Sequence, residues 1–150
     1  MATKYVMDRD LGMRKIMLEF ASANKAELVV GILEGSKNSE GANIAEYATY
    51  NEYGTDKIPE RPFMRTSFDE NKPKYIRAME KIAKEIGQVT FAKMVSILGH
   101  TAQNDIQKTI TGRDFLPKLS DYTIKKKKGS TKTLVDTGAM YDSIRHLIRK

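Results

Sequence analysis

The chain has 150 residues and no cysteine; it fits one domain, over residues 1–150, and excludes disulfides and thiolate metal sites. Its formal net charge of +7 is uneven, since residues 1–75 hold 11 basic and 12 acidic residues whereas residues 76–150 hold 15 and 7. This asymmetry indicates a polyanion or an acidic protein surface as partner, or else only solvated helix faces and one lysine-rich loop.

The N-terminal segment MATKYVMDRD is charged and lacks an apolar stretch, so we expect no signal peptide. No run of about 18 apolar residues occurs, so we expect no membrane partner. Residues 9–23 predict an amphipathic helix, because apolar side chains recur three and four positions apart. Residues 26–33 are short, apolar and β-branched, which predicts a buried strand. The helical stripe consists of Met13, Ile16, Met17 and Phe20.

Residues 34–43 combine glycine, serine, asparagine and charges, which is typical of a mobile loop or a hairpin tip. Residues 43–54 predict a short helix that ends at Gly54, since glycine readily adopts the left-handed conformation that ends helices. A strand that begins near Ala42 is the alternative.

Residues 55–65 predict a stiff, extended arm. Pro59 and Pro62 fix their own φ and push the residues before them toward extended conformations. In an extended chain Phe63 and Met64 point to opposite sides. Two alternatives stay open: the arm packs on its own core with Phe63 filling a gap, or it docks on a partner. A rigid segment loses little entropy on binding, and aromatic and arginine side chains carry much interface energy.

Residues 73–87 predict a helix with Pro73 in its first turn and one apolar stripe. Residues 89–111 predict a second helix that ends at Gly112. Without a break at Gly87 the two would form one bent helix. The expected inward residues are Tyr75, Ile76, Met79, Ile82, Ala83 and Ile86 in the first helix, and Phe91, Val95, Leu98, Ala102, Ile106 and Ile110 in the second.

In residues 114–133, Ser120 is a candidate cap for a short helix. In residues 134–144, Asp136 or Thr137 is expected to cap a helix that turns Met140, Tyr141 and Ile144 inward. Residues 145–150 alternate in polarity, which predicts an edge strand. We therefore expect an α+β fold, with two or three main helices against a small antiparallel sheet built from residues 26–33, the C-terminal strand and a candidate strand at residues 3–8.

The sequence offers little for catalysis. Asp136-Thr137-Gly138 matches the aspartic-protease triplet, but such enzymes need two of them, and a helix cap explains it better. The two histidines, His100 and His146, lie far apart in sequence, and we interpret them as ordinary residues rather than zinc ligands. No phosphate-binding glycine motif is present. We therefore expect no enzyme activity, no cofactor and no metal.

The run of four lysines lies in a predicted basic loop, residues 118–133. Lysine contacts with phosphate would give a salt-dependent, sequence-independent affinity for nucleic acid. A solvated surface is the alternative, because only Tyr122 lies near the run and no nucleic-acid-binding motif is present. The candidate polyanion contacts are Lys125, Lys126, Lys127, Lys128 and Lys132.

Three segments, here called the signature segments, resemble sequences of tailed-bacteriophage neck and tail-completion proteins, including virion morphogenesis proteins. They are EYGT followed by IPERPFMR in residues 52–65, LPKLSDYTI in residues 116–124, and VDTGAMYDSI in residues 135–144. Many such proteins have alanine where this chain has Glu60. In many, the third segment also precedes the first; the order here resembles a subset from contractile-tailed phages and prophages.

The resemblance implies a structural virion protein, assembled in the host cytoplasm, that forms a homo-oligomeric ring at the head–tail junction. Its other partners would be portal-side head-closure proteins and tail-terminator or tail-tube proteins, with nonspecific DNA in the channel. A nucleic-acid-binding accessory protein and an assembly chaperone are the alternatives. The expected interface residues are Tyr53, Ile58, Pro59, Arg61, Pro62, Phe63, Met64 and Arg65, and the expected turn and cap residues are Gly54, Asp136, Thr137, Gly138 and Ser143.

Overall fold

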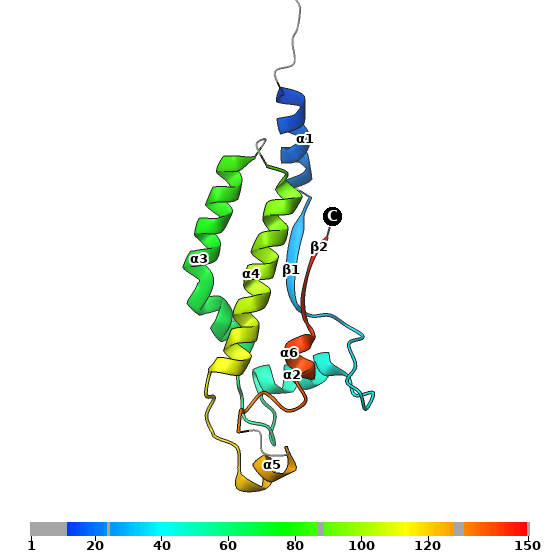
Figure 1. Cartoon of the computed structure of the whole chain (residues 1–150), viewed down its shortest axis with the longest axis vertical. Helices are drawn as coiled ribbons and strands as arrows, with labels where there is room; N and C mark the ends of the chain where they lie inside the picture. The colour runs from blue at the N-terminus through cyan, green and yellow to red at the C-terminus, as the bar shows by residue number, and fades with distance from the viewer. Residues whose placement is uncertain (1–11, 24, 87–88, 128–130, 150) are drawn as a thin grey trace, which may run out of the picture.

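The computed structural model describes residues 12–23, 25–86, 89–127 and 131–149. Within them the chain forms a two-stranded antiparallel sheet and several helices, which confirms the α+β prediction (Figure 1). The candidate strand at residues 3–8 lies outside the described residues. The elements are α1 (Met13–Ala23), β1 (Glu27–Ile32), α2 (Ile44–Tyr53), α3 (Phe63–Glu85), α4 (Phe91–Gly112), α5 (Asp121–Lys126), α6 (Ala139–Asp142) and β2 (Ile144–Arg149).

The sheet joins the two strands predicted in residues 26–33 and in the C-terminal segment. Strand β1 pairs with β2 from Glu27 opposite Arg149 to Ile32 opposite Ile144. Helix α4 packs against both strands. Gly99 allows this close packing, because a Cβ atom there would lie only 2.5 Å from Cδ2 of His146.

Helices α3 and α4 form an antiparallel hairpin (Figure 1). The alternative of one bent helix is wrong, since the chain is extended at Ile86 and again at Thr90; Gly87 lies outside the described residues. Helix α3 is ten residues longer at its N-terminus than predicted. Pro73 therefore lies inside the helix and not in its first turn, where the missing N–H removes one backbone hydrogen bond.

The buried core lies where α2, α4, α6 and the start of β2 meet. Phe63 and Ile144 are completely enclosed there, and Ile110 is nearly so. The inward prediction fails for Ile76, Met79 and Ala83, all of which are exposed. The other core members are Ile44, Ala48, Ile106, Phe115, Leu134 and Met140.

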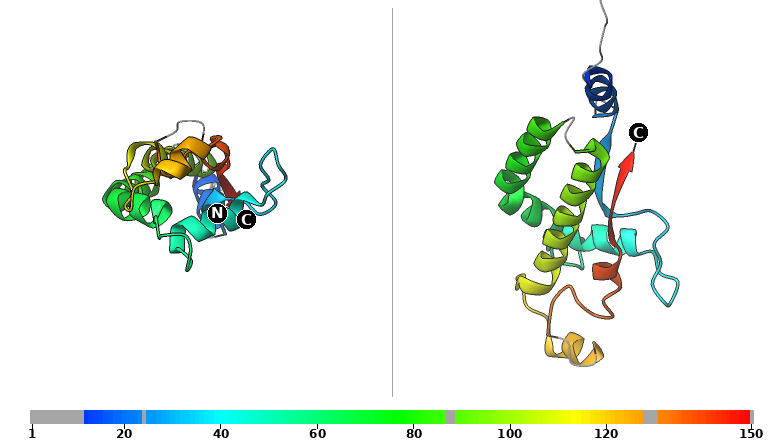
Figure 2. Two further views of the ribbon diagram at one scale, coloured as in Figure 1. Left: turned by 90° about the horizontal axis from the view of Figure 1, so that it is seen from below. Right: turned by 45° about the horizontal axis from the view of Figure 1, so that its top comes forward.

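The molecule is elongated, with α1 at one end and α5 at the other (Figures 1 and 2). Helix α1 extends beyond the sheet, whereas α2, α5 and α6 gather at the opposite end. No helix in the described part of the chain has both the length and the apolar character needed to cross a membrane.

Candidate functional site

The three signature segments meet around one cavity, here called the signature pocket, with a volume of about 420 Å³. The first segment contributes Ile58 and Arg61 to its wall, and the second contributes Leu119 and Thr123. The remaining wall includes Tyr47 and Asn51 of α2 and, from the third segment, Asp136, Thr137, Gly138, Ala139 and Met140. Segments more than 50 residues apart in sequence thus form a single structural unit.

The first signature segment is a loop held against α2 rather than a free arm. At Gly54 φ is +73°, and a Cβ atom there would lie 3.0 Å from the backbone nitrogen of Glu60, so both conformation and space favour glycine. The Thr55 N–H donates to the Ile58 carbonyl (2.8 Å), and the Arg61 N–H donates to the Asn51 carbonyl (2.6 Å). These bonds tie the loop at both ends.

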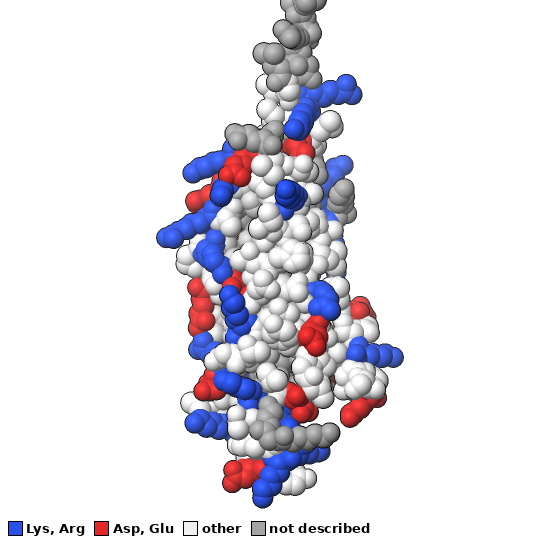
Figure 3. Space-filling model, viewed as in Figure 1, with Lys and Arg blue, Asp and Glu red and all other residues white. Residues whose placement is uncertain are grey.

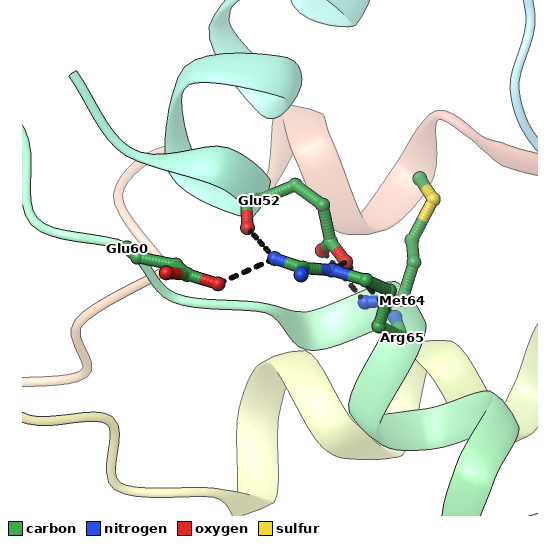
Figure 4. A network of polar contacts seen from close by, with 4 residues as sticks. All are labelled: Glu52, Glu60, Met64 and Arg65. Carbon is green, nitrogen blue, oxygen red and sulfur yellow. Dashed lines mark hydrogen bonds and ion pairs between the residues drawn. The ribbon is translucent and has the colours of Figure 1, made fainter.

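The prediction of an extended chain at residues 63–65 is wrong, because α3 begins at Phe63. The cause is a cap from a distant residue. Glu52, buried at the end of α2, accepts hydrogen bonds from the Met64 and Arg65 N–H groups, both at 2.9 Å (Figure 4). A carboxylate at a helix N-terminus satisfies free N–H donors and complements the helix dipole.

Arg65 completes this network. Its Nε donates to Oε1 of Glu52 (3.1 Å), and its terminal nitrogen donates to the Glu52 carbonyl and to Oε1 of Glu60, both at 2.6 Å (Figure 4). The guanidinium also lies 4.8 Å from the ring centre of Tyr53. The hydrogen bonds with Glu60 and then Glu52 raise the pKa of Arg65. Arg65 thus has partners within its own chain.

Two other residues predicted at a partner interface are enclosed in the chain. Phe63 fills the chain's own core, which was one of the two predicted alternatives for it. Arg61 is buried on the wall of the signature pocket, and its Nε has no hydrogen-bond partner among the described residues. Burial lowers the pKa of the Arg61 guanidinium, and the nearby Tyr47 partly opposes this. Of the predicted interface residues, Tyr53, Pro59 and Arg65 remain exposed.

The third signature segment forms the turn before β2. The cap position, predicted at Asp136 or Thr137, is Gly138, with φ of +83°, although Oγ1 of Thr137 accepts a hydrogen bond from the Ala139 N–H (3.4 Å). Ser143, at the end of α6, donates to the Ala139 carbonyl (2.7 Å). Met140 and Ile144 face the core as predicted, whereas Tyr141 is 36% exposed, because so short a helix buries only one side.

The predicted basic surface is smaller than the sequence suggests. Ser120 caps α5 as predicted, by accepting a hydrogen bond from the Thr123 N–H. The Lys127 amine donates to the carbonyls of Thr133 (3.0 Å) and Val135 (3.3 Å), and burial lowers its pKa. Lys132 pairs with Asp114.

Lys125 and Lys126 remain exposed, and Lys128 lies outside the described residues. On the face drawn in Figure 3, acidic and basic side chains lie side by side at the end that holds α5.

Two polar clusters were missed by the sequence analysis. The rings of His100 and His146, 46 residues apart, have their centres 4.2 Å from each other. Asp105, buried on α4, accepts a hydrogen bond from the Tyr75 hydroxyl (2.9 Å) and pairs with Lys74. Burial and then Asp105 raise the pKa of Tyr75. In the described part of the chain, no three histidine or acidic side chains gather as metal ligands.

Comparison with protein-family models, with curated proteins and with solved structures finds no match to this chain.

Proposed function

We propose that the chain is a structural subunit of a tailed-phage particle that assembles with copies of itself into a ring at the head–tail junction. It acts by protein–protein assembly rather than catalysis. The observation that carries the proposal is the convergence of the three signature segments on one pocket. Because they resemble the same protein group and also pack together, the resemblance involves one folded unit rather than three separate coincidences.

The surface of the isolated chain supports an assembly role. Met13, Met17, Leu18 and Phe20 of α1 are each more than half exposed, as are Phe68 and Met79 of α3. Large contiguous apolar surfaces on a soluble protein commonly mark interaction sites. A subunit whose partners are other subunits has a reason to present such a surface.

The test is mass spectrometry of particles purified from the phage or prophage that encodes the chain. We expect the chain in complete particles at several copies per particle, and we expect its deletion to yield separate heads and tails. Complete particles that lack the chain would refute a virion role and would favour an assembly chaperone.

The nucleic-acid alternative rests on the exposed Lys125 and Lys126. It is tested by measuring DNA affinity against salt concentration, since phosphate contacts give a steep dependence. With only these two described lysines exposed in the run, we expect weak binding and a shallow slope. We would favour a nucleic-acid-binding accessory protein if binding were tight and steeply salt-dependent, and if the double substitution Lys125→Ala and Lys126→Ala abolished it.

A further inference from the structure

An apolar groove of about 800 Å³ opens between the sheet, α3 and α4. Among the described residues that line it, Arg65 and Asp69 alone are charged. Phe68 and Met79, on the α3 side, are 55% and 52% exposed. The other walls are formed by apolar residues such as Val30, Leu98 and Ala102. The groove therefore fits an apolar occupant without charges on the contacting face.

Helix α1 of the same chain has such a face. Met13, Met17 and Phe20 follow one another at spacings of four and three, so they lie along one side of the helix. They are 64%, 65% and 52% exposed. Methionine adapts to irregular apolar surfaces, and it occurs on both surfaces, at residues 13 and 17 of the helix and at residues 64 and 79 of the groove.

Helix α1 is tied to the end of the hairpin in its own chain, and none of its residues lines the groove. Oε2 of Glu19 accepts a hydrogen bond from the Phe91 N–H (2.9 Å) at the start of α4, which fixes α1 beyond the end of the hairpin. Figures 1 and 2 show α1 extending past the end of the sheet. The exposed stripe of α1 is therefore placed to reach another molecule.

We propose that the stripe of α1 (Met13, Met17 and Phe20) docks in the apolar groove of a second copy of the chain. Helix and groove are different surfaces, so the contact is head-to-tail, and each copy offers one of each. Such contacts continue from copy to copy and form a ring when the rotation closes. This inference rests on the proposed ring function, and it names the contact that would join neighbouring copies in the ring.

The area of the contact predicts its strength. If a large side chain contributes roughly 200 Å², the exposed fractions of the three stripe residues leave roughly 350 Å² to cover on the helix. A two-sided contact then buries roughly 700 Å², which is below the roughly 1,000 Å² expected of a stable interface. We therefore expect weak, concentration-dependent association of the isolated chain, strengthened when a closed ring gives every copy two contacts.

The test uses matched pairs of substitutions in the full chain. Met17→Glu alters the stripe, and Leu18→Glu is its control, because Leu18 is equally exposed, at 64%, but lies on another face of α1. Met79→Glu alters the groove, and Ile97→Glu is its control, because Ile97 is 59% exposed and does not line the groove. Sedimentation over a range of concentrations gives the mass of each variant, with circular dichroism as the check on folding.

We expect the wild type and both controls to associate as concentration rises, and Met17→Glu and Met79→Glu to stay monomeric. Mixed in equal amounts, these two variants should form a species of two chains and nothing larger, because one intact groove then meets one intact stripe. A monomeric mixture would overturn the proposal, and would indicate a groove that takes its own α1 or another partner.

A wild type that stays monomeric at its highest soluble concentration would also overturn the proposal, as would association that survives either substitution. None of these outcomes bears on whether the chain occurs in particles, which mass spectrometry decides separately.

Discussion

Arg61 and Arg65 lie four residues apart in the first signature segment. The same substitution should change the free energy of unfolding in opposite directions at these two positions. Arg61 is buried, and its Nε has no hydrogen-bond partner among the described residues. Arg65 is partly exposed and bonds to both the side chain and the carbonyl of Glu52. Substitution by methionine keeps an unbranched stem as far as the position of Nε and removes the donors and the charge. Arg61→Met should therefore stabilise the isolated chain, and Arg65→Met should destabilise it.

The size of the first effect follows from the cost of a buried donor without a partner, which is about 1–3 kcal/mol. Arg61→Met also removes a positive charge that lowers the pKa of the Lys127 amine, so a repulsion is relieved. Some packing of the planar guanidinium is lost. We expect a net gain of about 1 kcal/mol in the free energy of unfolding, which corresponds to a rise in Tm of about 2–4 °C for a chain of this length.

Thermal and urea unfolding followed by circular dichroism measure both variants against the wild type. Glu52→Gln tests the network in Figure 4 from the other side, because it keeps the shape of the side chain but replaces one of the two oxygens that accept from the Met64 and Arg65 N–H groups. We expect it to cost about 2 kcal/mol. A fall in Tm of several degrees for Arg61→Met, or no change for Arg65→Met, would show that the roles inferred for the two arginines are wrong.

Three further outcomes are expected. Gly54→Ala should lower Tm, because φ is +73° there and the added Cβ meets the Glu60 backbone, and thermal unfolding checks it. Gly99→Ala should also lower Tm through the clash with His146, and pairing it with His146→Ala, which removes the ring, should recover part of the loss. Burial and then His100 lower the pKa of His146 below 6.5. The unfolded chain therefore binds this proton more readily, so stability should be fully present above pH 6.5 and fall below it; His100→Gln should flatten that fall, and equal slopes would contradict it.

The sequence predicted those elements whose signals are local. The strand in residues 26–33 and the alternating C-terminal strand pair as expected. Helix α4 follows its apolar periodicity, and Gly54 and Ser120 act as the end signals predicted for them. In each case the residues that specify the element lie inside it or next to it, so a single sequence contains the information.

The start of α3 could not be predicted in this way. Pro59 and Pro62 indicate an extended chain, and Pro73 is a typical first-turn residue, so the local signals all place the helix too late. The residue that caps the helix, Glu52, lies 12 positions before Met64 and reaches it only because the Gly54 turn folds the loop back onto α2. A cap supplied by tertiary structure leaves no spacing signal in the sequence.

The apolar stripes led to a different error, which concerns burial and not the position of a helix. Ile76 and Met79 share the periodicity of a buried face, yet they are 43% and 52% exposed. The pattern identifies an apolar face correctly, but it does not say whether the same chain covers that face. The same holds for Met13 and Met17 of α1. Under the proposed function, the exposed parts of these stripes would contact other subunits.

The positions of the two sites suggest how one subunit could serve two kinds of neighbour. The signature pocket lies at the end formed by α2, α5 and α6, whereas α1 extends from the other end (Figure 1). A head-to-tail contact between α1 and the groove uses the α1 end and the flank of the α3–α4 hairpin. It leaves Tyr53 and Pro59 of the first signature segment exposed. Under the proposed function, copies of the chain would join through the groove, and a different protein would meet the surface beside the signature pocket. Substitutions at these two surfaces should therefore have different effects. Met17→Glu should prevent self-association. Tyr53→Ala should leave self-association intact and impair the joining of heads to tails.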